Sequence, residues 1–156
     1  MTRIEEVIAD AYPGAEVGHT KDGCVWWRVA VAAVGDAVRL LQRAGCDRFL
    51  DLTAVDDPTR TDRFELNYLF YASSQQRWFR LKARSSGTAP SIVALIAGAR
   101  FYEREVFDLF GVRFDGHDGL ARLLLPDDWQ GHPLRRDEPL GDEPVDFTVT
   151  REVYGT

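Results

Sequence analysis

The chain has 156 residues, 45% of them hydrophobic, and a formal net charge of -6. This length and apolar content suit one globular domain with a sizeable core. The acidic balance lacks the basic stripe that binds a phosphate backbone, so we expect no nucleic-acid partner.

The first third of the sequence alternates between helical and strand-like patterns. A possible capping box of Thr2 and Glu5, together with apolar residues at helical spacing over 4–11, predicts a first helix. β-Branched and aromatic residues predict a strand over 24–31. Helical spacing returns over 36–44 and predicts a second helix.

The middle of the chain has three strand-like runs, over 48–55, 64–71 and 78–83, which predict a β-meander. A further helix is expected over 101–110, where Gly111 can terminate it in the left-handed conformation. The two layers of such a domain are helices packed on a mostly antiparallel mixed sheet, which is an α+β fold.

The last 45 residues have a different composition. Residues 1–111 carry a net charge of -1, whereas 112–156 carry -5 and hold four of the seven prolines. Their apolar side chains, from Phe114 to Tyr154, are too numerous for a solvated tail. We therefore expect an α+β domain over 1–111 and an extended, proline-rich arm over 112–156 that docks on a partner.

Adjacent tryptophans stand in the first predicted strand. Trp26 and Trp27 must point to opposite sides of it, so at most one belongs to the core and the other is a candidate contact residue. The two cysteines, Cys24 and Cys46, form no CxxC pair and are interpreted as buried apolar residues.

Targeting and metal-binding patterns are lacking. The N-terminal segment has acidic residues where a secretory signal needs an apolar run. The longest apolar run, near 92–97, is far shorter than the roughly 20 residues that span a bilayer. We expect no transmembrane segment, and no metal or cofactor held by this chain.

The densest ionisable cluster lies in the helix expected over 101–110. Glu103, Glu105 and Asp108 point in different directions on a helix, so they do not form a facing acid and base pair. Arg104 can pair with Asp108 at i,i+4. Structural or interface contacts are favoured over catalysis here.

Histidines and arginines mark the arm. His117 and His132 each follow a glycine and are interpreted as hydrogen-bonded turn residues, since no acid or nucleophile stands at a recognisable spacing. Arg122, Arg135 and Arg136 interrupt an acidic segment with forked donors suited to carboxylates across a protein interface. Solvated surface is the competing interpretation for these arginines.

Two long motifs resemble a known family. Residues 102–117, YEREVFDLFGVRFDGH, and 123–137, LLLPDDWQGHPLRRD, resemble, in the same order, signature segments of the C subunit of respiratory complex I, the 30 kDa subunit family. Here 118–122 read DGLAR where the family usually has PDLRR. Signature and interface positions carried over from the resemblance are Glu103, Arg104, Glu105, Asp108, Phe110, Gly111, Phe114, Gly116, His117, Arg122, Pro126, Trp129, Gly131, His132, Pro133, Arg135 and Arg136.

The resemblance implies a non-catalytic peripheral-arm subunit of proton-pumping NADH:quinone oxidoreductase. Its expected partners are the D subunit, which belongs to the quinone module, and the neighbouring B and I subunits. FMN and iron–sulfur clusters would lie in other subunits, with none in this chain. The implied location is peripheral, on the cytoplasmic face of the bacterial cell membrane.

Other functions compete with this one. Membrane-bound nickel–iron hydrogenases and F420H2 dehydrogenases use a related subunit. A free-standing hydrolase would have to use Glu103, Asp108 and His117, but the sequence offers no nucleophile elbow or oxyanion motif. A small-ligand module on the tryptophan-bearing sheet is the remaining alternative.

Overall fold

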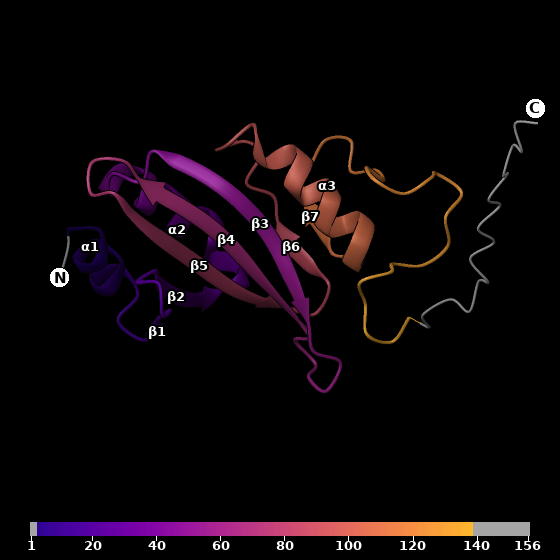
Figure 1. Cartoon of the computed structure of the whole chain (residues 1–156), viewed down its shortest axis with the longest axis horizontal. Helices are drawn as coiled ribbons and strands as arrows, with labels where there is room; N and C mark the ends of the chain where they lie inside the picture. The colour runs from indigo at the N-terminus through magenta and orange to yellow at the C-terminus, as the bar shows by residue number, and fades with distance from the viewer. Residues whose placement is uncertain (1–2, 139–156) are drawn as a thin grey trace, which may run out of the picture.

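Residues 3–138 are the part of the chain that the computed structural model describes, and they form a mixed sheet with helices packed on it (Figure 1). The elements, in chain order, are α1 (Arg3–Ala11), β1 (Glu16–His19), β2 (Val25–Ala30), the 3-10 turn η1 (Val31–Ala33), α2 (Val34–Ala44), β3 (Arg48–Asp56), β4 (Phe64–Ala72), β5 (Arg77–Ser85), β6 (Thr88–Pro90), α3 (Ala99–Phe110) and β7 (Arg113–Asp115).

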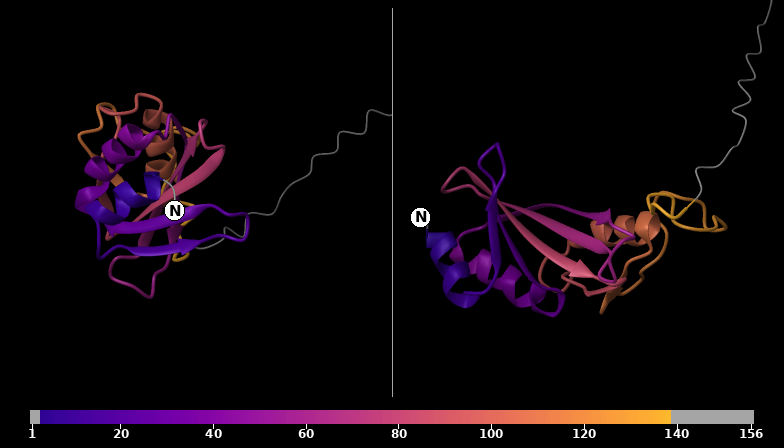
Figure 2. Two further views of the ribbon diagram at one scale, coloured as in Figure 1. Left: turned by 90° about the vertical axis from the view of Figure 1, so that its left-hand side faces the viewer. Right: turned by 90° about the horizontal axis from the view of Figure 1, so that it is seen from below.

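The sheet has five strands in the order β1-β2-β5-β4-β3. Only β2 and β5 run parallel; the other neighbouring pairs are antiparallel, with β3, β4 and β5 forming the expected meander. Helices α1 and α2 lie together on one side of the sheet (Figure 2). The predicted α+β class, with helices on a mostly antiparallel mixed sheet, is confirmed.

The core lies between the sheet and its helices. Alternate side chains of the strands enter it, among them Trp27 and Phe79, whose rings stack with centroids 5.9 Å apart. Trp26, on the opposite side of β2, is only partly buried, as the alternation of a strand requires. Cys24 and Cys46 are buried and free, so the interpretation as apolar residues is confirmed.

A second, two-stranded sheet extends the domain beyond Gly111. β6 pairs in parallel with β7, and Val112 and Phe114 are 0% and 3% exposed. The segment 112–115 is thus part of the packed fold, although we expected the arm to begin at 112. No further helix or strand occurs over 116–138.

Some expectations lie outside the described residues or missed short elements. Thr2 of the capping box and residues 139–156 of the arm are not among those described. Strands β1, β6 and β7 were not expected from the sequence, because three or four residues carry too little periodicity. Within 3–138, no helix is long and apolar enough to cross a membrane.

Candidate functional site

After β7 the chain turns back along α3, and 116–138 run beside that helix (Figure 1). The contact is made largely by polar groups. The backbone N–H of Leu134 donates to the carbonyl oxygen of Leu109 over 3.0 Å, and the guanidinium of Arg100 donates to the carbonyl oxygen of Asp118 over 2.7 Å. We call 116–138 the return segment.

Asp108 is the centre of this contact. Its side chain is completely buried. Its Oδ2 atom accepts the backbone N–H groups of Leu123, Leu124 and Leu125 over 3.0, 2.7 and 3.0 Å. Its Oδ1 atom accepts a hydrogen bond from Arg122 over 2.8 Å. One carboxylate therefore fixes four successive residues of the return segment.

The same contacts determine the ionisation of Asp108. Burial raises the pKa of the carboxyl group, but the N–H of Leu125, the Arg122 guanidinium, and the N–H groups of Leu124 and Leu123 lower the pKa to about 2. Asp108 is consequently ionised at neutral pH and acts as a fixed acceptor rather than as a proton donor.

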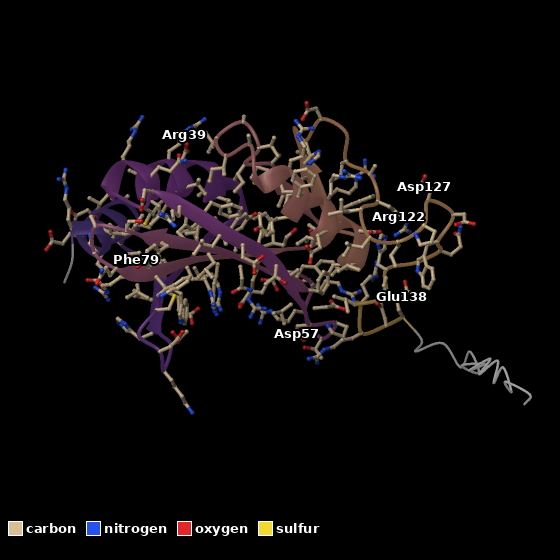
Figure 3. The ribbon with its side chains drawn as sticks, turned by 45° about the horizontal axis from the view of Figure 1, so that its top comes forward. Arg39, Asp57, Phe79, Arg122, Asp127 and Glu138 are labelled. Atoms are coloured by element: carbon tan, nitrogen blue, oxygen red, sulfur yellow. The ribbon has the colours of Figure 1, made fainter. Side chains whose placement is uncertain are left out.

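Arg122 continues the network from the return segment itself (Figure 3). Besides Asp108, its guanidinium donates to the carbonyl oxygens of Trp129 and Gly131 over 2.8 and 3.0 Å. Its side chain is only 16% exposed. The Arg122 guanidinium is thus bonded to acceptors of its own chain. We had expected it to bind carboxylates across a protein interface.

The expected pairing of Arg104 with Asp108 is wrong. Arg104 instead donates to the carbonyl oxygens of Ala121 and Arg122. The reason is that Asp108 is enclosed by the N–H groups of the return segment, while the long Arg104 side chain reaches the carbonyl groups just before them.

Both histidines are hydrogen-bonded, as predicted, and their partners are backbone carbonyls of α3, which the sequence did not indicate. His132 Nδ1 lies 2.9 Å from the carbonyl oxygen of Asp108, and His117 Nε2 lies 3.2 Å from that of Arg100. The His132 ring lies against Gly111, where a Cβ atom would come within 2.7 Å of it. Gly111 also has a φ of 77°, so the glycine is needed for both the helix end and the histidine.

A second fastening joins the return segment to the end of β3. Asp56, 3% exposed, accepts two hydrogen bonds from Arg63 over 2.7 and 2.6 Å and one from the backbone N–H of Arg136 over 2.8 Å. Arg63 also pairs with Asp137 over 2.9 Å. The Arg63 hydrogen bonds hold the pKa of Asp56 below its usual value despite burial.

Sequence reasoning missed this fastening. No contact was expected of Asp56, and Asp137 stood only as the last residue of a motif. The signal present in the sequence was the motif itself, which ends on Asp137.

Glu103 is a buried acid with a local structural role. Its carboxylate is 0% exposed and accepts hydrogen bonds from the hydroxyl of Ser91 and the N–H of Ile92, both over 2.7 Å. Burial raises the pKa of this carboxyl group. Glu103 therefore anchors the loop after β6 to α3 and shares none of these partners with Asp108.

The remaining signature residues divide between core and surface. Phe110 and Phe114 are 7% and 3% exposed and belong to the core. Glu105 is half-buried on α3, and Arg135 pairs with Asp137 over 3.1 Å. The signature residues exposed on the return segment or its glycine-flanked turns are Gly116, Pro126, Trp129, Pro133 and Arg136.

Apolar side chains face outward from the return segment. Leu124, Trp129 and Leu134 are 62%, 46% and 52% exposed. The backbone of Leu124 and Leu134 bonds to Asp108 and Leu109 of α3, and the backbone of Trp129 bonds to Pro126 and Arg122 within the return segment. Large exposed apolar side chains held in fixed positions are a mark of protein interaction sites. We call these three residues the outer apolar surface.

The acidic groups of the site are engaged in structural hydrogen bonds. The carboxylates of Glu103 and Asp108 are each bound to separate donors, and the described residues contain no group of three or more His, Cys, Asp or Glu that could hold a metal ion. An outer apolar surface on a hydrogen-bonded backbone is a common mark of a protein interaction site.

Comparison with known proteins identifies a family for this chain. The profile of the family described as respiratory-chain NADH dehydrogenase, 30 Kd subunit, matches residues 27–144. The chain belongs to that family, which is the 30 kDa subunit family of complex I.

Individual relatives point the same way. The NADH-quinone oxidoreductase C subunit of Roseiflexus sp. (strain RS-1) is 42% identical over 105 residues, which cover 65% of this chain and 60% of the relative. The chain therefore spans about three fifths of the length of that relative. The NADH-quinone oxidoreductase C/D subunit of Methylococcus capsulatus is 40% identical over 134 residues, covering 77% of this chain and 23% of the relative.

A solved structure is also similar. A chain of the membrane-bound sulfane sulfur reductase, an archaeal respiratory membrane complex, aligns with a TM-score of 0.77 and 26% identity over 88% of this chain and 84% of that chain. The likeness extends the fold to a second kind of respiratory membrane complex.

The stability that the Asp108 contacts give to the return segment should fall at acid pH. Asp108 has a pKa of about 2 in the folded chain, below the value near 3.9 of an unfolded aspartate. A depressed pKa contributes stability that is present above about pH 4 and lost as the pH falls towards about 2. The shift corresponds to about 2–3 kcal/mol. Urea unfolding between pH 5 and pH 2 measures this loss.

The D108N variant is the control, because it lacks the titrating group but keeps Glu103, whose raised pKa has the opposite effect on stability in this range. The difference between the wild-type and D108N free energies of unfolding should shrink as the pH falls. A difference that stays constant from pH 5 to pH 2 would contradict the role given to Asp108.

Proposed function

We propose that this chain is a non-catalytic peripheral-arm subunit of a proton-pumping NADH:quinone oxidoreductase and that it supports the D subunit of the quinone module. The observation that carries the proposal is the Methylococcus relative, whose name joins the C and D subunits. In it, a sequence that matches 77% of this chain is part of one longer polypeptide. Two proteins made as one chain in one organism are commonly neighbours in another.

The outer apolar surface is the docking surface in this proposal. Its residues Leu124, Trp129 and Leu134 are exposed while the backbone that bears them is fixed, so binding costs little ordering entropy. Arg136 adds an exposed arginine on the same return segment, and its backbone N–H is bonded to Asp56. An aromatic ring and an arginine are the side chains that most often dominate an interface.

The share of this chain in the reaction is then mechanical. FMN and iron–sulfur clusters in other subunits carry electrons from NADH to the quinone, and the B and I subunits complete the surroundings. This chain holds the quinone-module partner in position at the cytoplasmic face of the membrane. Its own contribution is a rigid frame, supplied by the two fastenings at Asp108 and Asp56.

The alternative is that this chain is a subunit of a different respiratory complex, because the similar archaeal chain belongs to another respiratory membrane complex. A related subunit of a membrane-bound nickel–iron hydrogenase or F420H2 dehydrogenase would keep the same docking surface but a different electron input. NADH:quinone oxidoreductase is favoured because the curated relatives in bacteria carry that name.

Removing the outer side chains should weaken assembly without unfolding the chain. We expect W129A to lower the affinity for the D subunit by at least about 30-fold, the effect of losing a central interface anchor of about 2 kcal/mol or more. R136A should weaken it by about tenfold, since its loss leaves a partner carboxylate unpaired. Co-purification and titration with the purified D subunit measure both.

The matched control is R43A, which removes an exposed arginine from α2, on the helix-covered side of the sheet. R43A should bind like the wild type. Unchanged binding of the D subunit by W129A would overturn the assignment of this docking surface. A melting temperature of W129A or R136A well below that of the wild type would overturn it too. R135A is less informative, because Arg135 pairs with Asp137 inside the chain.

A further inference from the structure

The side of the sheet that faces away from α1 and α2 carries a row of cationic side chains on β5. The register of the strands places five cations on this side, Arg28, Arg48, Arg80, Lys82 and Arg84, and three carboxylates, Glu16, Asp51 and Glu65. The strand positions alone therefore carry two more positive than negative charges, while Asp22 in the turn before β2 lies near Arg80, and Asp57 and Asp62 in the turn after β3 lie near Arg84. We call this side of the sheet the open face.

The cations gather around a single carboxylate. Glu65 accepts contacts from Arg28, Lys82 and Arg84 over 2.7, 3.2 and 3.3 Å. Burial raises the pKa of Glu65, but the hydrogen bonds and charges of Lys82 and Arg28 hold it below its usual value. One negative charge does not neutralise three positive ones, even with Glu16 paired to Arg28.

The cluster also has unused donors. Arg28 Nε and Arg84 Nη1 are buried and have no hydrogen-bond partner within the described part of the chain. Arg80 makes no direct hydrogen bond or ion pair to any of residues 3–138, although its charge acts on the nearby carboxylate of Asp22. The guanidinium of Arg80 is therefore the group of this row that is left for a further direct contact, since the unpartnered atoms of Arg28 and Arg84 are buried.

The geometry of the row limits what can bind. Arg80, Lys82 and Arg84 occupy alternate positions of β5, so they repeat about every 7 Å. A hollow of about 280 Å³ lies beside them on the open face, and its lining includes Thr53 of β3, Asn67 of β4 and Arg80 of β5. The side chains of Lys82 and Arg84 are 17% and 23% exposed, recessed into the face. The headgroups of a flat membrane would make few contacts with such recessed cations, whereas individual side chains of a bound protein segment can reach them.

We propose that the open face binds an acidic segment of another protein, in extended conformation along β5, with carboxylates at alternate residues facing Arg80, Lys82 and Arg84. Extended chains repeat their side-chain direction every second residue at the same spacing as the row of cations. This surface lies on the sheet, apart from the outer apolar surface, and the inference does not depend on which complex the chain belongs to.

A peptide pair tests the charge and the spacing together. The purified chain is titrated against two fluorescein-labelled peptides of equal composition, one alternating glutamate and serine and one with the glutamates in a single block. Anisotropy should show tighter binding of the alternating peptide. R80Q/R84Q should lower that affinity by about tenfold, and R80K/R84K, which keeps the charges, should largely retain it.

The matched control is R39Q/R43Q, which removes two charges from the solvent side of α2, where Arg39 points away from the sheet (Figure 3). It should bind the alternating peptide like the wild type. Equal loss in both double variants, equal binding of both peptides, or no binding overturns the proposal. So does binding confined to phosphatidylglycerol vesicles, or displacement of the peptide by equimolar inorganic phosphate.

A second experiment locates the partner in the native assembly and does not require the glutamine variants to fold. The R80K variant is assembled with its partners in its native membranes and treated with a zero-length carbodiimide, which joins a lysine to a carboxylate in contact. Mass spectrometry should find position 80 linked to an aspartate or glutamate of another protein, and position 39 of an R39K control unlinked. Linkage of position 80 only to its own chain, or none, contradicts the proposal.

Discussion

The D108N variant is expected to release the return segment from α3 while the sheet stays folded. In the wild type, the Asp108 carboxylate accepts three consecutive backbone N–H groups and the guanidinium of Arg122. An amide of the same shape has only one acceptor oxygen, so its NH2 group would face donors, and Arg122 would lose its countercharge.

The expected loss is about 3–5 kcal/mol, which is the effect of removing one partner from a buried ion pair. Because the affected residues are those of the return segment, the loss should appear first as local opening. Amide hydrogen exchange at 123–125 should speed up by about two to three orders of magnitude, with little change in β4 and β5.

The matched control is D36N, on an exposed ion pair of α2 whose aspartate is 73% exposed. Its effect should be within about 1 kcal/mol. If exchange at 123–125 were the same in D108N and D36N, the Asp108 contacts would not be holding the return segment.

The second large effect is expected from F110A. Phe110 is 7% exposed and packs into the core at the end of α3, so its removal should lower the free energy of unfolding by about 3–5 kcal/mol. Phe107, one turn earlier, is half-buried and meets the His132 ring edge-on, with centroids 6.0 Å apart. F107A should therefore cost less, about 1–2 kcal/mol, and loosen the return segment.

Urea unfolding of both variants beside the wild type measures these costs. The slope of the free energy of unfolding against urea concentration should be the same in the variants and the wild type. An equal slope shows that the variants expose the same surface on unfolding as the wild type does. A near-neutral F110A would place Phe110 outside the core. An F107A loss as large as that of F110A would show that the His132 contact is part of the main core.

The fold was largely predictable because its long elements carry strong periodicity. The meander of β3, β4 and β5 and the helices α1, α2 and α3 follow from apolar spacing and from glycines that end helices. The parallel pairing of β2 with β5 follows from no local pattern, because it is a contact between segments about 50 residues apart.

The candidate site was found by resemblance, but the roles of its residues were not. The spacing of Arg104 and Asp108 on one helix suggested a pair, whereas each bonds to the backbone of the return segment. Such tertiary bonds are invisible in the sequence, because the donors to Asp108 are N–H groups of leucines. The position of His132 against Gly111 needed the folded chain for the same reason.

The structure also changes how the arm is understood. Its proline-rich composition suggested an arm extended over a partner, but residues 116–138 are bonded to their own α3 and β3 and present selected side chains outward. A preformed surface of this kind binds with less loss of conformational entropy than a segment that folds on contact.

The central claim, that this chain supports the quinone-module D subunit of an NADH:quinone oxidoreductase, is tested most directly by purification from native membranes. The tagged chain is recovered in mild detergent, its partners are identified by mass spectrometry, and NADH:quinone activity is assayed on the eluate. We predict the D subunit among the partners together with NADH-dependent quinone reduction. Recovery with a hydrogenase module, or without any stable partner, would contradict the claim.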